Sequence, residues 1–178
     1  MRILSLVIIA VVAAVLLVGP SNASEREFYQ DVQGKWSGQG EIVAGKFKNT
    51  RFTCSFEGIS PDAVTGINID GSCRVGMFSQ PMTATVERAM AGYSGRFLDG
   101  AAGDGLDITG GRYTQSRLVV DVRRKDLRGV MAARLTDSDN MNVTISVHVN
   151  DRLIPVIGMS LRRIGAPIDR TRTSSIDR

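Results

Sequence analysis

Apolar and polar residues alternate with a period of two along most of this chain. The clearest stretch is residues 142–149, where every second residue is Val or Ile and the residues between them are Thr, Ser and His. A strand with one buried face requires this alternation. Similar short runs recur up to residue 164 and are separated by turn-forming Gly, Asp and Asn.

The pattern predicts one short helix followed by nine or ten strands. Ser24 and Glu27 have the spacing of a capping box, so the helix is expected over residues 24–33. We expect turns at Gly110-Gly111, at Lys125-Asp126 and around Asp137 to Asn140. The expected strands are residues 34–43, 50–58, 67–75, 82–88, 93–98, 106–109, 117–124, 129–136, 141–150 and 153–164.

The fold class that follows is all-β. We expect an antiparallel up-and-down barrel of about 8–10 strands with a short N-terminal helix, because consecutive short strands with little helical periodicity are typical of that architecture. A β-sandwich is the alternative, since it has the same period and similar turns.

The N-terminus has the composition of a secretory signal. Arg2 precedes an apolar run over residues 3–18, and small residues at 21–23 predict cleavage after Ala23. A run of 16 residues is shorter than the roughly 20 that a membrane-spanning helix needs. We therefore predict a signal peptide over 1–23, one domain over 24–164, a disordered basic tail over 165–178, and a periplasmic or secreted location with membrane contact only through an uncleaved signal.

Net charge gives no reason to expect nucleic acid as a partner. The chain has 22 Lys and Arg against 18 Asp and Glu, a net charge of +4. Loss of Arg2 with the signal would lower the net charge to +3. This small excess is spread along the sequence, whereas nucleic-acid binding needs a concentrated basic surface.

The two cysteines of an exported chain are expected to form a disulfide. Residues 50–58 and 67–75 both alternate, and pairing Cys54 with Cys73 in an antiparallel ladder also places Gly58 opposite Ile69. All apolar side chains then lie on one face, which a register shifted by one residue would not achieve. The turn between the strands is expected around Pro61 to Val64.

No catalytic or metal-binding motif is present in the sequence. The nucleophile elbow Gly-x-Ser-x-Gly is missing, and His148 is the only histidine, so any histidine-dependent mechanism would have to use it. His148 lies on the polar side of its strand. We expect a non-catalytic protein with no metal and no cofactor, and an enzyme is the least favoured of three functional hypotheses.

Gly34 and Trp36, at the start of the first strand and after a short helix, resemble the beginning of the calycin superfamily, which includes lipocalins and fatty-acid-binding proteins. In lipocalins the tryptophan plugs the closed end of the barrel, and an arginine from near the last strand lies across its ring. The resemblance implies that Arg162 or Arg163 has this role through a cation–π contact.

Calycin resemblance also implies a lumen that binds a small apolar ligand. The inward-facing apolar residues expected to line or fill it are Phe52, Phe56, Ile69, Met82, Val86, Ile145 and Val147. An eight-stranded barrel either is plugged by side chains or holds one ligand, and the sequence leaves both open.

The second hypothesis is an interaction module that binds a periplasmic or other envelope protein. One form of it resembles the secreted bacterial metalloprotease inhibitors, small barrels with one disulfide, in which residues 24–33 would enter the protease. The outline also resembles the haem barrels of the nitrobindin type. That family uses a histidine near its C-terminal strand, and residues 149–178 contain none.

Overall fold

The computed structural model describes residues 21–90, 92–98 and 105–165. Within them, helix α2 (Ser21–Val32) precedes ten strands. The strands are β1 (Gly34–Ile42), β2 (Arg51–Ile59), β3 (Gly66–Val75), β4 (Phe78–Ala89), β5 (Gly92–Leu98), β6 (Leu106–Thr114), β7 (Arg117–Arg124), β8 (Leu127–Leu135), β9 (Asn140–Val149) and β10 (Arg152–Ile164).

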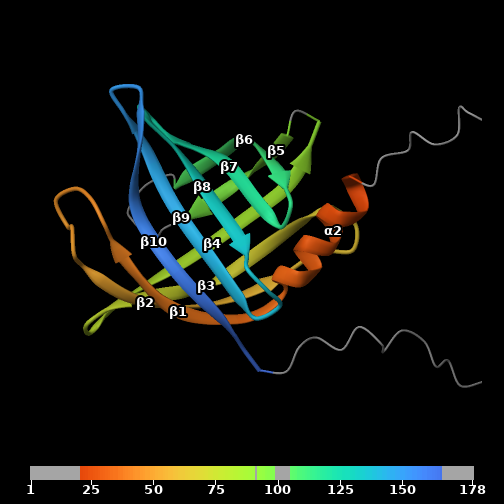
Figure 1. Ribbon diagram of the computed structural model, residues 1–178, viewed down its shortest axis with the longest axis horizontal. Coiled ribbons are helices and arrows are strands. Elements are labelled where there is room, and N and C mark those ends of the chain that lie inside the picture. The colour runs from red at the N-terminus through yellow and green to blue at the C-terminus, as the bar shows by residue number, and fades with distance from the viewer. Residues whose placement is uncertain (1–20, 91, 99–104, 166–178) are drawn as a thin grey trace, which may run out of the picture.

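The ten strands form a closed antiparallel barrel in which each strand pairs with its neighbours in sequence and β1 also pairs with β10. The predicted all-β up-and-down barrel is thus confirmed, and the sandwich alternative is wrong. Because consecutive strands run in opposite directions, their connections alternate between the two ends of the barrel. Figure 1 shows α2 at one end, here called the closed end, and the β1–β2, β3–β4 and β9–β10 connections at the other, here called the mouth.

Helix α2 covers the closed end with one face. Glu25, Phe28, Tyr29 and Val32 are buried, and their spacing of three and four residues places them on one stripe of an α-helix. The helix begins at Ser21 rather than at Ser24, so the predicted cleavage after Ala23 falls within its first turn. No helix among the described residues is long and apolar enough to cross a membrane.

Predictions for the two termini mostly concern residues outside the described part of the chain. The predicted signal peptide, apart from residues 21–23, and the predicted tail, apart from Gly165, are not described, and both remain predictions. The last strand ends at Ile164, where the predicted domain ends.

The predicted disulfide and its strand register are confirmed. Cys54 and Cys73 are directly opposite each other in the β2–β3 ladder and are joined by a disulfide, with 4.0 Å between their Cα atoms. Gly58 is opposite Ile69, as the register requires. The bridge links the two strands that follow β1.

Two predicted boundaries are wrong for identifiable reasons. The turn expected at Gly110-Gly111 is strand, because β6 runs on to Thr114 through a register shift between Ile108 and Gly110, and a bulge accommodates the glycines. Strand β4 begins at Phe78 rather than Met82. Pro81 lies in the part of β4 that pairs with β3 but not yet with β5, whose ladder begins at Thr83. This part of β4 is an edge strand, and an edge strand tolerates proline, which has no N–H to donate.

Removing the disulfide should lower stability. The Cys54→Ala, Cys73→Ala double variant is expected to lose about 3 kcal/mol of unfolding free energy, because the unfolded chain regains the conformational freedom of a loop closed across 19 residues. Urea denaturation followed by Trp36 fluorescence measures the loss. Reduction of the native protein should produce the same shift, and an unchanged midpoint would contradict the prediction.

Candidate functional site

The closed end is sealed around Trp36, which is almost completely buried. Its indole Nε1 donates a hydrogen bond of 2.8 Å to the carbonyl oxygen of Val32, the last residue of α2. Gly34 has a φ of 100°, a conformation that glycine adopts without strain, and it turns the chain from the helix into β1. The side chain of Trp36 therefore satisfies a helix-end carbonyl that would otherwise lack a partner.

Arg163 completes the seal from β10. Its guanidinium lies 4.3 Å from the centre of the Trp36 ring and donates hydrogen bonds to the carbonyl oxygens of Asp31, at 2.5 Å, and Gln33, at 2.6 Å. A cation at a helix C-terminus also interacts favourably with the helix dipole. Of the two arginines implied by the calycin resemblance, Arg163 has this role, and Arg162 is exposed.

A second polar cluster fixes the N-terminal half of α2 to the barrel. Tyr93 donates a 2.5 Å hydrogen bond to the buried carboxylate of Glu25, and Arg88 donates to the same carboxylate at 3.0 Å and to the Tyr93 hydroxyl at 3.3 Å. The nearby Tyr29 hydroxyl is buried and has no hydrogen-bond partner among the described residues. Burial is the main cause that raises the pKa of both tyrosines, with the hydrogen bond to Glu25 adding to it at Tyr93.

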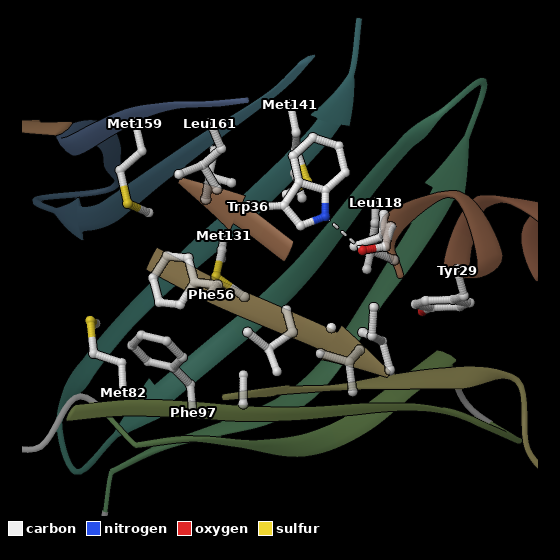
Figure 2. Close-up of a pocket in the computed structure, with 18 of the residues that line it drawn as sticks. Tyr29, Trp36, Phe56, Met82, Phe97, Leu118, Met131, Met141, Met159 and Leu161 are labelled. Atoms are coloured by element: carbon white, nitrogen blue, oxygen red, sulfur yellow. Dashed lines mark hydrogen bonds between the residues drawn. The ribbon is translucent and has the colours of Figure 1, made fainter. Parts of the chain in front are cut away.

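Above this floor lies an apolar chamber of about 90 Å³, here called the deep chamber. The described residues that line it include no charged side chain, and Tyr29, Trp36 and Thr83 are the only ones with a polar side-chain atom. Figure 2 shows Trp36, Leu118 and Tyr29 on one side of this space and Met82, Phe97 and Phe56 on the other. The deep chamber therefore has no group that would hold a polar ligand atom by charge.

A larger space of about 360 Å³, here called the outer chamber, lies between the deep chamber and the mouth. Its wall includes Val75, Phe78, Ser79 and Gln80 from the β3–β4 hairpin. The residues common to both chambers form a constriction between them and are Phe56, Met82, Phe97, Met131 and Met159. The lumen is thus open at the mouth and narrows towards the floor.

The structure places six of the seven sequence-predicted lumen residues on these walls. Ile69 and Val86 line the deep chamber, Phe52 and Ile145 line the outer chamber, and Phe56 and Met82 line both. Val147 lines neither. That any of these residues contacts a ligand remains a prediction.

Several wall residues were missed by the sequence reasoning. Met131, Met141, Met159 and Leu161 all occupy inward positions of β8, β9 and β10. Alternation alone could have identified Met159 and Leu161, which have the same parity as Arg163 in the last strand. Phe28 and Tyr29 come from the helix, whose position over the closed end no local pattern reveals.

The only histidine lies away from the lumen. His148 borders an exposed groove of about 650 Å³ on the outer wall, together with Asp121, Arg123, Asp126 and Asp151. The His148 side chain forms no hydrogen bond or ion pair among the described residues. In the same part of the chain, no three His, Cys, Asp or Glu side chains are grouped closely enough to hold a metal ion.

No protein-family model matches the chain, and no curated protein matches it. Among solved structures, the crystal structure of Rv2717c from M. tuberculosis is similar to this chain with a TM-score of 0.47 and 10% sequence identity, over 79% of this chain and 98% of that one.

Loss of the Arg163 guanidinium should destabilise the closed end. Arg163→Ala is expected to cost about 2–4 kcal/mol of unfolding free energy, because two helix-end carbonyls lose charged donors and the indole loses its cation. Arg162→Ala, one residue away and exposed, should change the unfolding free energy by no more than about 0.5 kcal/mol. Equal effects of the two substitutions in urea denaturation would refute the role given to Arg163.

The buried tyrosines should make stability sensitive to alkaline pH. Folding raises the pKa of Tyr29 and Tyr93 above the usual value near 10. The two tyrosines therefore contribute fully to the free energy of unfolding below pH about 10, and this contribution is lost as the pH rises further. Tyr29→Phe should reduce this alkaline loss and, at pH 7, should not destabilise, because it removes a hydroxyl without a partner.

Tyr93→Phe supplies the contrast at neutral pH. The substitution should lower the free energy of unfolding by about 1–3 kcal/mol, because the Glu25 carboxylate loses a hydrogen-bond donor and stays buried. Unfolding free energies measured for both variants at pH 7 and pH 11 check the pair. The interpretation fails if the two substitutions have the same effect at pH 7.

Proposed function

We propose that the protein is a non-catalytic binding protein that holds a small apolar ligand, or the apolar tail of an amphiphile, in the barrel lumen. The observation that carries the proposal is a deep chamber with apolar walls that adjoins a wider chamber opening at the mouth. The outer chamber, at about 360 Å³, is within the size range of small-molecule sites.

The walls define the chemistry of the ligand. A polar group placed in the deep chamber would lose its water and find almost no partner, which is costly. The polar side chains Ser79 and Gln80 border the outer chamber near the mouth. An amphiphile would therefore enter with its apolar end first and leave its polar end near these two residues.

Methionines at the constriction suit ligands of varied shape. Met82, Met131 and Met159 border both chambers, and the unbranched, polarizable methionine side chain adapts to irregular apolar surfaces. Rotation of these side chains would join the two chambers into one longer cavity. A linear ligand would then reach from the mouth to Trp36.

Resemblance to the calycins supports the same proposal. A helix leading into Gly34-x-Trp36, with Arg163 across the indole at the closed end, has the arrangement that the resemblance implies. Export is part of the proposal, and the disulfide supports it, because disulfides persist in oxidising compartments such as the periplasm.

The inhibitor form of the second hypothesis finds less support. Residues 24–33 would have to enter a protease, yet Glu25, Phe28 and Tyr29 are packed on the closed end of the barrel. Entry into a protease would expose this apolar face and break the Glu25 hydrogen bonds.

Filling the deep chamber should weaken ligand binding. Ala133 lines it and Ala132, its neighbour on β8, does not. Ala133→Leu is expected to weaken binding of the neutral dye N-phenyl-1-naphthylamine roughly tenfold, because the added methyl groups take space that the ligand would fill. Dye fluorescence and energy transfer from Trp36, the only tryptophan, measure the binding.

The matched control is Ala132→Leu, which makes the same substitution on the opposite face of the same strand and should bind the dye as the native protein does. Urea denaturation of both variants shows that they are folded. If the native protein does not take up the dye, or if both substitutions weaken it equally, the lumen is not the ligand site.

A further inference from the structure

Exposed apolar side chains stand at the tips of the connections around the mouth. Met77 is 94% exposed, Phe78 81% and Phe47 62%, and they occupy the β3–β4 hairpin and the β1–β2 connection. Leu127 in the β7–β8 hairpin and Val149 at the β9–β10 hairpin are also exposed. The connections that carry these side chains all lie at the mouth, and Phe78 belongs to the wall of the outer chamber.

Basic side chains accompany these apolar tips. Lys46 and Lys48 flank Phe47, Arg74 precedes the β3–β4 turn, and Lys125 lies in the β7–β8 turn. Lys46 lies 5.6 Å from the centre of the Phe47 ring. Within the described residues, none of Lys48, Arg74 and Lys125 forms an ion pair, so their charge is available to a partner.

The two ends differ in the charge of their connections between strands. The described connections at the closed end contain Asp62, Asp137 and Asp139 but no Lys or Arg, whereas those at the mouth contain Lys46, Lys48 and Lys125 together with Asp126 and Asp151. Exposed apolar residues occur at the closed end too, at Ile59, Val64 and Met90, without basic neighbours in the connections. Residues 99–104, between β5 and β6, include Asp99 and Asp104. They lie outside the described part of the chain, and their charge is counted at neither end.

The β3–β4 hairpin extends past its neighbours. The β2–β3 ladder reaches only Arg74, and the β4–β5 ladder begins only at Thr83, so the residues around Met77 pair with each other alone. Figure 1 shows this hairpin projecting at the mouth, away from α2. Met77 and Phe78 are thus presented on a two-stranded arm.

We infer that the mouth docks on an anionic lipid surface. The apolar tips would insert among the acyl chains near the headgroups, and Lys46, Lys48, Arg74 and Lys125 would contact the anionic headgroups, as apolar and basic residues do together in peripheral membrane proteins. This inference goes beyond the proposed ligand binding and does not depend on it. It differs from the sequence prediction, which limited membrane contact to an uncleaved signal.

A fluid lipid surface fits these features better than a protein does. The exposed apolar residues stand on separate connections around an opening and do not form one packed patch, whereas the core of a protein interface is closely packed. A bilayer adapts to separate tips, and its negative surface potential attracts the basic residues beside them. Charge complementarity therefore favours anionic lipid as the partner.

Vesicle binding of matched triple variants tests the inference. The apolar variant carries Phe47→Ser, Met77→Ser and Phe78→Ser, and the control variant carries Ile59→Ser, Val64→Ser and Met90→Ser at the closed end. The native protein should co-sediment with vesicles of phosphatidylcholine and phosphatidylglycerol more than with pure phosphatidylcholine. The apolar variant should lose at least about tenfold in partition coefficient, and the control variant should not.

The charge contribution needs its own variant. Lys46→Gln, Lys48→Gln and Lys125→Gln together should also weaken binding to the anionic vesicles at least about tenfold, and added salt should weaken native binding in the same way. All proteins are exported by the same host and their N-termini are checked by mass spectrometry, so that residues 3–18 cannot differ between them. Ala133→Leu should bind vesicles normally, which separates this inference from ligand binding.

A local probe covers the case in which a triple variant does not fold. Met77→Trp and Met90→Trp place the same probe at hairpin turns on opposite ends, and both positions are fully exposed. Vesicles of brominated lipid should quench the added fluorescence of Met77→Trp and not that of Met90→Trp. The inference is overturned if the native protein does not bind anionic vesicles, or if both probes are quenched equally. It is also overturned if light scattering shows a native dimer that the Phe47→Ser, Met77→Ser and Phe78→Ser variant converts to a monomer.

Discussion

The end of helix α2 is the constraint on which the rest of the structure depends. The last carbonyls of a helix lack internal partners, and here Trp36 from β1 and Arg163 from β10 supply the donors. The same two residues stack on each other across the β1–β10 ladder, where they are directly opposite. The cation–π contact joins the first and last strands at the seam that closes the barrel, and the hydrogen bonds of the same two residues join the helix to that seam.

Closing one end in this way determines what the other end can do. The floor of the lumen consists of an indole and the apolar face of a helix, so the deep chamber is apolar and its described lining carries no charged side chain. The charged groups Glu25 and Arg88 bond to each other and to Tyr93, and none of these three residues lines that cavity. Whatever enters the lumen has to come through the mouth, where the wider chamber opens.

Alternation was sufficient to predict the architecture and the Cys54–Cys73 register, because both depend on which side of a strand each residue faces. It did not separate Arg162 from Arg163, although parity with the apolar Leu161 would have done so. The basic residues of the mouth lie far apart in the sequence, because every second connection returns to the same end of the barrel. Their charge therefore looked evenly spread along the chain. The helix contribution to the lumen was not predictable from any local pattern, because it depends on the tertiary seal at Trp36.

The opening at the mouth, the apolar walls and the basic residues beside the opening are also connected energetically. Moving an apolar ligand from a bilayer into a cavity through water costs about 0.8 kcal/mol for each methylene that is exposed on the way. A mouth held against lipid by Met77, Phe78 and the neighbouring cations would let the ligand pass from acyl chains to the outer chamber while staying out of water. In such a protein, adhesion at the rim lowers the barrier to loading, and the sealed floor keeps the bound ligand dry.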